Sequence, residues 1–364
     1  MNNKGIVNEV FWLRAIACLV VTFGHALQNG YHYFTEITIY HNLAYLLYMG
    51  VLFGVPVFVF LSEFLLSYKY AETVPKGFMK KRFKVLLPPY LCMSTVYALF
   101  RIDEWTILNV LSEVGKNIFF GYSTIYFILI IFQFYLLHMA ARKYLNRLPA
   151  KIVIPVAFVI NIGYLSIFNF SEAPQHPLAI YLWNPGYWMP FFGWLFYFVL
   201  GFYCGKHYKT VLQQLHRYRI LVYVFPIFTF SGVLLMNKIF MLTQDSKRVD
   251  MLLFATSVIF LLMYVASRMK ITPGIVLLIS NYSFSIFLLN EMFFILLLQI
   301  KPPAFFNMMT YSLVAFLITI IGSIMLSYLL NLFPFGKYIA GKIMPFRKEK
   351  RSLAEQRYLR KVNG

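Results

Sequence analysis

The chain has 364 residues, of which 60% are hydrophobic, 20% aromatic and only 13% charged. A soluble protein of this length carries about a quarter charged residues, so the composition excludes an ordinary water-soluble enzyme. The formal net charge of +20 does not predict nucleic-acid binding, because Lys and Arg lie in short stretches between apolar segments and near the C-terminus. We therefore expect an all-α integral membrane protein with membrane lipids as partners and no nucleic-acid partner.

Apolar stretches recur along the whole sequence, and a membrane-spanning helix needs about 20 mostly apolar residues. The pattern predicts ten transmembrane helices, at 7–28, 44–67, 85–102, 125–141, 152–170, 188–205, 219–238, 250–267, 275–298 and 309–333. The third is the least regular, because it contains Pro88 and Pro89. The first contains Arg14 and is followed by no signal-peptidase cleavage pattern, so we interpret it as a permanent helix.

The basic residues predict the orientation of these helices. With the N-terminus in the cytoplasm, 26 of the 33 Lys and Arg fall on cytoplasmic segments and 6 on outer segments. This asymmetry follows the positive-inside rule and predicts that both termini are cytoplasmic. We expect a membrane-embedded domain over 1–336 and a basic cytoplasmic tail over 337–364 that contacts anionic lipid headgroups.

The predicted outer loops 28–43 and 171–187 contain few charges and many Tyr, His, Asn and Pro residues. Such side chains suit contacts with sugars. Tyr and Trp also form the ordinary aromatic belt at a membrane surface, which is the more common reason for such a composition. Both interpretations stay open. No His or Cys spacing is typical of a metal site, so we expect no metal.

Two ionisable residues lie inside the first predicted span, Arg14 and His25 in FWLRAIACLVVTFGHAL. They are 11 residues apart, close to three turns, so both project from one face, about 16 Å apart along the axis. A guanidinium is a permanent anion ligand, and an imidazole moves protons near neutral pH. The pair suggests an anionic donor at the cytoplasmic end and proton chemistry further out. The alternative is structural, with a snorkelling Arg14 and a His25 that caps the helix.

Further segments form an ordered set with this pair. They are GVPVFVFLSEFLL, KKRFKVLLPPY, STIYFILIIFQFY, FGWLFYFVLGFYCG and SNYSFSIFLLNEMFF. In this order, and over nearly the whole chain, they resemble the motifs of the acyltransferase-3 family of membrane O-acyltransferases. The sequences of these motifs are especially similar to those of the family member encoded in the staphylococcal intercellular adhesin (biofilm polysaccharide) locus. The resemblance implies a multi-pass protein of the bacterial plasma membrane.

The resemblance also implies an activity and roles for individual residues. The protein would take an acyl group from cytoplasmic acyl-CoA, acetyl-CoA or succinyl-CoA, and place it on a hydroxyl of an extracytoplasmic cell-envelope glycan, with no bound cofactor. His25 would deprotonate the acceptor hydroxyl or assist acyl relay. Arg14 and Arg82 would bind the phosphates of the donor or orient the site, with Lys84 beside them. A polysaccharide synthase is a candidate partner.

The chain departs from the family pattern at several supporting positions. Glu63 replaces a glycine and could pair with Arg14 or with the basic loop before the third span. Tyr126 stands where Trp is more common. In the segment SNYSFSIFLLNEMFF, which begins at Ser280, Ser283 fits the motif, whereas Asn290 replaces a histidine. These departures could alter the donor or the acceptor, or weaken the activity.

A second class of function remains open. A ten-helix protein with buried charge and aromatic outer loops could also transport a polysaccharide or a lipid-linked sugar. The feature that favours the enzyme is His25 together with Arg14 inside the wider set of motifs, because a transporter has no need of a general base.

Overall fold

The computed structural model describes residues 8–102, 104–240 and 243–343. Within these ranges every regular element is a helix, which confirms the all-α prediction. The longer helices are α1 (Asn8–Tyr33), α3 (Gly54–Tyr70), α4 (Phe78–Leu99), α6 (Phe127–Arg147), α7 (Ala150–Phe170), α11 (Arg219–Phe240), α12 (Met251–Arg268), α13 (Gly274–Leu297) and α14 (Met308–Asn331). The shorter ones are α2 (Ile39–Val51), α5 (Ile107–Phe119), α8 (Pro177–Trp183), α9 (Leu195–Lys206) and α10 (Tyr208–Arg217), with the 3₁₀ turns η1 (Thr124–Tyr126), η2 (Gly186–Trp188), η3 (Phe191–Trp194) and η4 (Gly336–Tyr338).

Eight helical segments in the described part of the chain are long and apolar enough to cross a membrane. One of them, Ile39–Tyr70, joins α2 and α3 across a break at Leu52 and Phe53. Two predicted spans fall outside this set. The apolar stretch Phe191–Lys206 is short, and the first turns of α4 contain the basic run 80–84. The chain is thus a multi-pass membrane protein, and the count of ten spans stays a prediction.

Several boundaries differ from those expected from the sequence. The helix α1 continues to Tyr33, so the connection to α2 is shorter than predicted. The connections also contain α5 and α10, two amphipathic helices that the search for long apolar stretches could not find. On α5 the side chains of Leu108 and Leu111 are exposed, as in a helix that lies at a membrane surface.

Burial separates a central group of helices from a peripheral one. In α13, 61% of the apolar 18-residue stretch is buried inside the protein, compared with 17% of the corresponding stretch in α7 and in α11. The outward faces of α7 and α11 present apolar side chains, among them the exposed Val159 and Phe228. Such faces suit contact with lipid, so α1, α3 and α13 form the protein interior in which polar groups can gather.

Two glycines allow a close approach of helices α3 and α9. A Cβ on Gly201 would lie 2.6 Å from the carbonyl oxygen of Phe60, and one on Gly205 would meet the carbonyl of Phe64. Ser67 on α3 donates a 2.6 Å hydrogen bond to the carbonyl of Phe202 on α9. Small residues at such positions let membrane helices approach backbone to backbone.

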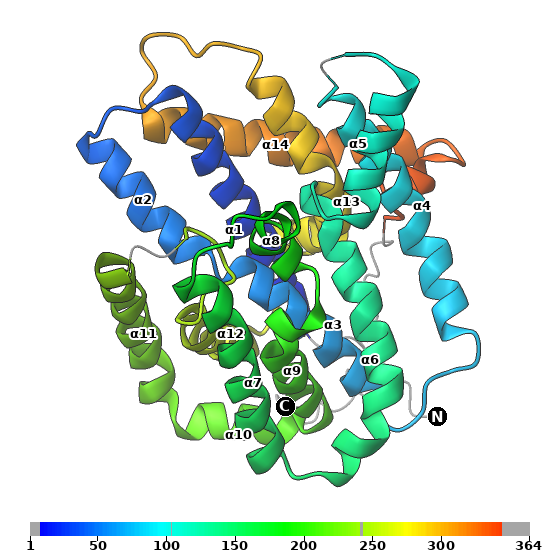
Figure 1. Ribbon diagram of the computed structural model, residues 1–364. Coiled ribbons are helices and arrows are strands. Elements are labelled where there is room, and N and C mark those ends of the chain that lie inside the picture. The colour runs from blue at the N-terminus through cyan, green and yellow to red at the C-terminus, as the bar shows by residue number, and fades with distance from the viewer. Residues whose placement is uncertain (1–7, 103, 241–242, 344–364) are drawn as a thin grey trace, which may run out of the picture.

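The connections sort to opposite ends of the molecule. The α3–α4 and α6–α7 connections and the helix α10 lie at the lower end in Figure 1, whereas α5 and the α13–α14 connection lie at the upper end. The lower group contains the three most basic segments between helices, 68–84, 142–151 and 206–219. This arrangement agrees with their predicted location on one side of the membrane.

Candidate active site: a cavity between two charged ends

A cavity of about 750 Å³ opens between α1, α3, α4, α6 and α13. Arg14 and His25 both line it, as their common face on α1 predicts. Of the other expected site residues, Arg82, Tyr126, Ser283 and Asn290 line the same cavity, in regions far apart in the sequence. Its described lining contains six Lys and Arg side chains but only one carboxylate, so it favours an anionic ligand.

Two of the expected residues lie elsewhere. Lys84 is exposed on α4 and is not part of the cavity lining. Glu63 is fully buried between α3 and α6, where its carboxylate lies 2.6 Å from Nδ1 of His138. The expected pairing of Glu63 with Arg14 or with the basic loop is therefore wrong. His138, which lies within α6, supplies the partner.

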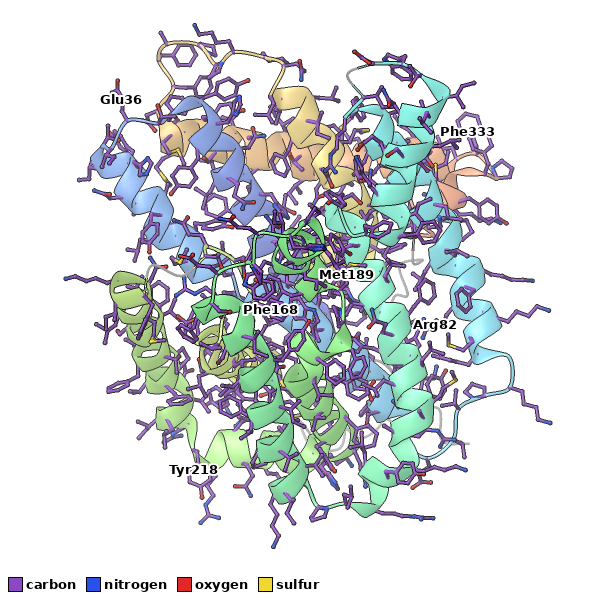
Figure 2. All side chains as sticks on the ribbon, in the orientation of Figure 1. Glu36, Arg82, Phe168, Met189, Tyr218 and Phe333 are labelled. Atoms are coloured by element: carbon purple, nitrogen blue, oxygen red, sulfur yellow. The ribbon has the colours of Figure 1, made fainter. Side chains whose placement is uncertain are left out.

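One end of the cavity is basic and aromatic. Arg82 lies between α4 and α6 (Figure 2), with its guanidinium carbon 5.0 Å from the Phe78 ring and 5.2 Å from the Tyr135 ring. Arg14 is close enough to Tyr135 to interact with it electrostatically. Lys69 also lines the cavity. We call Arg14, Lys69 and Arg82 the basic end; among the described residues, none of the three forms an ion pair.

At the other end of the cavity, a chain of hydrogen bonds fixes the tautomer of the His25 imidazole. Tyr48 donates its hydroxyl proton to the carbonyl of Gln244 at 2.9 Å, so its oxygen accepts from Nε2 of Gln28 at 2.6 Å. The remaining atom of that amide, Oε1 of Gln28, therefore faces Nδ1 of His25 at 3.0 Å. Because Oε1 only accepts, Nδ1 carries the proton and the lone pair is on Nε2. This is the form of imidazole that acts as a base.

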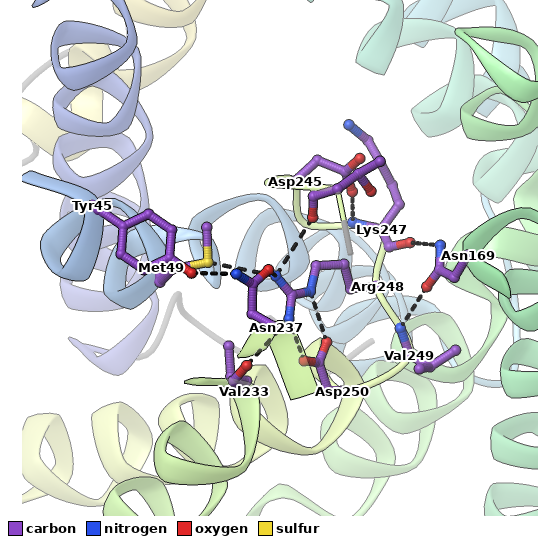
Figure 3. Close-up of polar contacts among 11 residues, drawn as sticks. Tyr45, Met49, Asn169, Val233, Asn237, Asp245, Lys247, Arg248, Val249 and Asp250 are labelled. Carbon is purple, nitrogen blue, oxygen red and sulfur yellow. Dashed lines mark hydrogen bonds and ion pairs between the residues drawn. The ribbon is translucent and has the colours of Figure 1, made fainter. Parts of the chain in front are cut away.

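Residues 243–250, which precede α12, form the wall near His25. Arg248 is fully buried and donates to both carboxylate oxygens of Asp250, at 3.1 and 2.6 Å (Figure 3). It also donates to Asn237 Oδ1 at 2.9 Å, which ties the segment to α11. The clamp holds Asp245 and Lys247 in the cavity lining. Sequence reasoning missed these two residues, because they lie in a predicted loop without a motif.

The side chains of Asp245 and Lys247 both contact aromatic residues. The ammonium of Lys247 lies 3.8 Å from the centre of the Trp188 ring. Tyr187 donates to Asp245 at 3.4 Å, and burial, with the nearby carboxylate, raises the pKa of the Tyr187 hydroxyl so that it keeps its proton. The predicted outer loop 171–187 thus reaches the site through Tyr187. An amphipathic wall of this kind suits a sugar, with a ring face and hydroxyl groups to recognise.

A second ion pair braces the same region. Arg101 donates to Glu291 at 2.6 Å, and the other carboxylate oxygen accepts from the backbone and hydroxyl of Thr124 at 3.0 and 2.6 Å. The pair fixes η1 against α13. As a result Tyr126, at the end of η1, faces Trp188 across 5.9 Å between ring centres.

One wall of the cavity, along α13, carries buried polar atoms without partners. Ser280 and Asn290 are 1% and 2% exposed, and among the described residues neither Oγ of Ser280 nor Oδ1 of Asn290 has a hydrogen-bond partner. Both residues line the cavity, and Ser283 lies between them. Unpaired buried polar groups are costly, so these positions suit contacts with a polar ligand.

Comparison with known proteins identifies the family. A family model described as an acyltransferase domain (acyltransferase-3) matches residues 7–330. The chain belongs to the acyltransferase-3 family. A Bacillus subtilis (strain 168) protein, named by inference as the membrane-bound acyltransferase YfiQ, is 38% identical over 357 residues, which cover 94% of this chain and 97% of that protein. No solved structure matches.

More distant relatives carry a different name. A protein of Staphylococcus aureus (strain MRSA252), named by inference as a poly-β-1,6-N-acetyl-D-glucosamine export protein, is 29% identical over 62% of this chain and 65% of its own length. A Staphylococcus epidermidis protein of the same name is 26% identical over 78% of this chain and 79% of its own. The resemblance to the family, including its staphylococcal biofilm-polysaccharide members, is confirmed.

Proposed function

We propose that this acyltransferase-3 protein moves an acyl group from acyl-CoA at the basic end of the cavity to a hydroxyl of an extracytoplasmic cell-envelope glycan near His25. The observation that carries the proposal is the single cavity that joins the phosphate-binding residue types at one end to a positioned imidazole about three helical turns away on α1. Neither a snorkelling Arg14 nor a capping His25 would need to line a common cavity.

The basic end suits the phosphates of the donor. Guanidinium groups bind phosphate through two parallel hydrogen bonds, and a cation that already lies on an aromatic ring is partly desolvated. Arg82 has this setting between Phe78 and Tyr135. With its phosphates there, acetyl-CoA or succinyl-CoA would extend its pantetheine arm along the cavity toward His25.

The chemistry at His25 is a single acyl transfer. Nε2 of His25 takes the proton of the acceptor hydroxyl as its oxygen attacks the thioester carbonyl. The bond from carbon to sulfur then breaks, the ester forms and the CoA sulfur leaves with a proton. Gln28 and Tyr48 keep the imidazole in the basic form, and Asn290 lies on the facing wall as a polar contact for the substrate.

The wall formed by Trp188, Lys247 and Asp245 supports a glycan as the acceptor. The names of the staphylococcal relatives also refer to a sugar polymer, poly-β-1,6-N-acetyl-D-glucosamine. A polysaccharide synthase in the same bacterial plasma membrane would supply such an acceptor to the outer side. Both termini would lie in the cytoplasm, as the distribution of basic residues predicts.

Those same names support a second candidate function, export of a polysaccharide. A transporter would use the aromatic and charged wall to pass sugars and would leave their hydroxyls unchanged. The two candidates differ in one product, the acylated glycan.

The donor role can be tested with two neighbouring cations of α4. Arg82 lines the cavity, whereas Lys84 is exposed and does not. We expect Arg82→Ala to lower the rate of acyl transfer from labelled acyl-CoA at subsaturating donor by about 10- to 100-fold, as for the loss of a charge-assisted hydrogen bond. Lys84→Ala should stay close to the unaltered protein. The measurement uses membrane vesicles with matched amounts of inserted protein.

If the Arg82→Ala and Lys84→Ala variants transfer the acyl group at equal rates, the basic end does not bind the donor. If neither the variants nor the unaltered protein transfer label to the glycan, the result favours the export function.

A further inference from the structure

The chain returns to the membrane domain after its last long helix. The residues that follow α14 turn through η4, which packs against α4 and α14. Ala340 is completely buried, and Asn331 Nδ2 donates a 3.1 Å hydrogen bond to the carbonyl of Gly341. Residues 337–343 are thus packed against the domain, although the sequence suggests that they begin a cytoplasmic tail. The rest of that tail, 344–364, lies outside the described residues.

A glycine fixes the direction of this returning segment. Gly341 has a φ of +78°, in the left-handed region that side chains rarely adopt. A Cβ there would lie 2.5 Å from the Phe284 ring, and Phe284 itself lines the cavity. The next two residues then diverge. Lys342 joins the cavity lining, and Ile343 packs into the cluster that contains Ala15 of α1.

The returning segment therefore adds a cation to the cavity that the three residues of the basic end also line. Ile343 packs in the same cluster as Ala15, which follows Arg14 directly in α1. Across the whole described lining the one carboxylate is Asp245, which lies with Lys247 in the segment near His25. Four cations that line a cavity without a carboxylate among them need a counter-anion, and a phosphate group supplies one. The unpartnered Ser280 hydroxyl on α13 offers a further donor to such a group.

We propose that Lys342, carried into the cavity by the returning C-terminal segment, binds a phosphate group of the acyl-CoA donor together with Arg14, Lys69 and Arg82. The proposal rests on the proposed function, because it assigns a ligand to the basic end. It separates Lys342 from the remaining basic residues of 337–364, which we expect to contact lipid headgroups. The C-terminal segment is then part of the donor site.

A matched pair of lysines tests the proposal. Lys337 is exposed in η4, with its ammonium 4.9 Å from the Tyr338 ring, and it does not line the cavity. The measurement is equilibrium binding of coenzyme A to the purified full-length protein in nanodiscs of phosphatidylcholine, without acceptor. We expect Lys342→Ala to weaken binding about tenfold, as for one charge-assisted hydrogen bond, and Lys337→Ala to leave it unchanged. Lys342→Arg should retain binding.

The outcomes separate the proposal from the function on which it rests. If the unaltered protein binds coenzyme A and both alanine variants bind it equally well, Lys342 has no role at the donor site and the proposal is wrong. If no protein binds coenzyme A, the proposed donor is itself wrong. If Lys342→Ala leaves coenzyme A binding unchanged but weakens the binding of added anionic phosphatidylglycerol, the phosphate belongs to a lipid headgroup, and the donor assignment of Lys342 is overturned. Thermal unfolding of each variant shows that the fold is retained.

Discussion

At the scale of single residues, the arrangement around His25 is the most specific feature of the site. The direction of three hydrogen bonds, from Tyr48 back to the imidazole, leaves Nε2 as the atom with a free lone pair. The family resemblance implies that His25 acts as a base, but the sequence does not predict Gln28 and Tyr48 as its partners. Gln28 is only three residues from His25 on the same helix, a spacing that sequence analysis could have used. Tyr48 comes from another helix, and only the fold brings it close.

Removing the Tyr48 hydroxyl should slow the reaction without affecting the binding of the donor. In Tyr48→Phe the Gln28 amide is free to turn, so that its NH₂ group faces His25 and the other imidazole tautomer is favoured. We expect kcat to fall about 3- to 10-fold, the size of one neutral hydrogen bond, with the donor KM unchanged. Tyr40→Phe, at an exposed position of the same helix α2, is the control. A fall in both variants, or a change in the donor KM alone, would contradict the positioning role.

Residue types at other positions show where sequence reasoning fails. From the sequence, Glu63 is expected to pair with Arg14 or with the basic loop before α4. The fold instead buries it with His138, and Nε2 of that histidine lies 3.4 Å from the carbonyl of Tyr70. A buried carboxylate needs a partner, but the sequence does not show which distant residue supplies it.

At the scale of elements, long apolar stretches are easy to recognise and short amphipathic ones are not. The spans at α1, α6, α7 and α11–α14 follow from the sequence, because lipid demands a continuous apolar surface. A search for long apolar stretches does not detect the break between α2 and α3 or the helices α5 and α10. These features follow from packing and from surface contacts. The returning segment after α14 was hidden for a similar reason, because its basic composition is also typical of a free tail.

The close approach of α3 and α9 gives a test at this scale. Gly201→Ala places a methyl group 2.6 Å from the Phe60 carbonyl, so the helices must separate, and overpacking of this kind costs about 1–3 kcal/mol. Gly163→Ala in the peripheral helix α7 meets nothing within 4 Å and should keep or raise stability, because Ala favours a helix more than Gly does. Thermal unfolding in detergent measures both. Similar shifts for the two variants would mean that the α3–α9 contact is looser than described.

At the scale of the whole molecule, the fold brings two chemistries to the ends of one cavity. The basic end collects cations from α1, α3 and α4, and the opposite end collects His25, the clamped segment before α12 and the aromatic turn η2. The central helices carry the polar groups, whereas α7 and α11 turn apolar faces outward. This division suits a donor and an acceptor that arrive from opposite sides of a membrane. Export of a polysaccharide would need a path for the polymer but no base with a fixed tautomer.

The most direct test of this account is the number of acyl groups per sugar in the envelope glycan, normalised to the amount of membrane-inserted protein. His25→Ala removes the proposed base and leaves the rest of the cavity lining in place. Loss of a positioned general base typically costs about 10²–10⁴-fold in rate, so acylation per sugar should nearly vanish. Arg14→Lys should retain part of the acylation, and Arg14→Ala should not. If His25→Ala leaves the ratio intact while the amount of exported glycan falls, the protein is a transporter and not an acyltransferase.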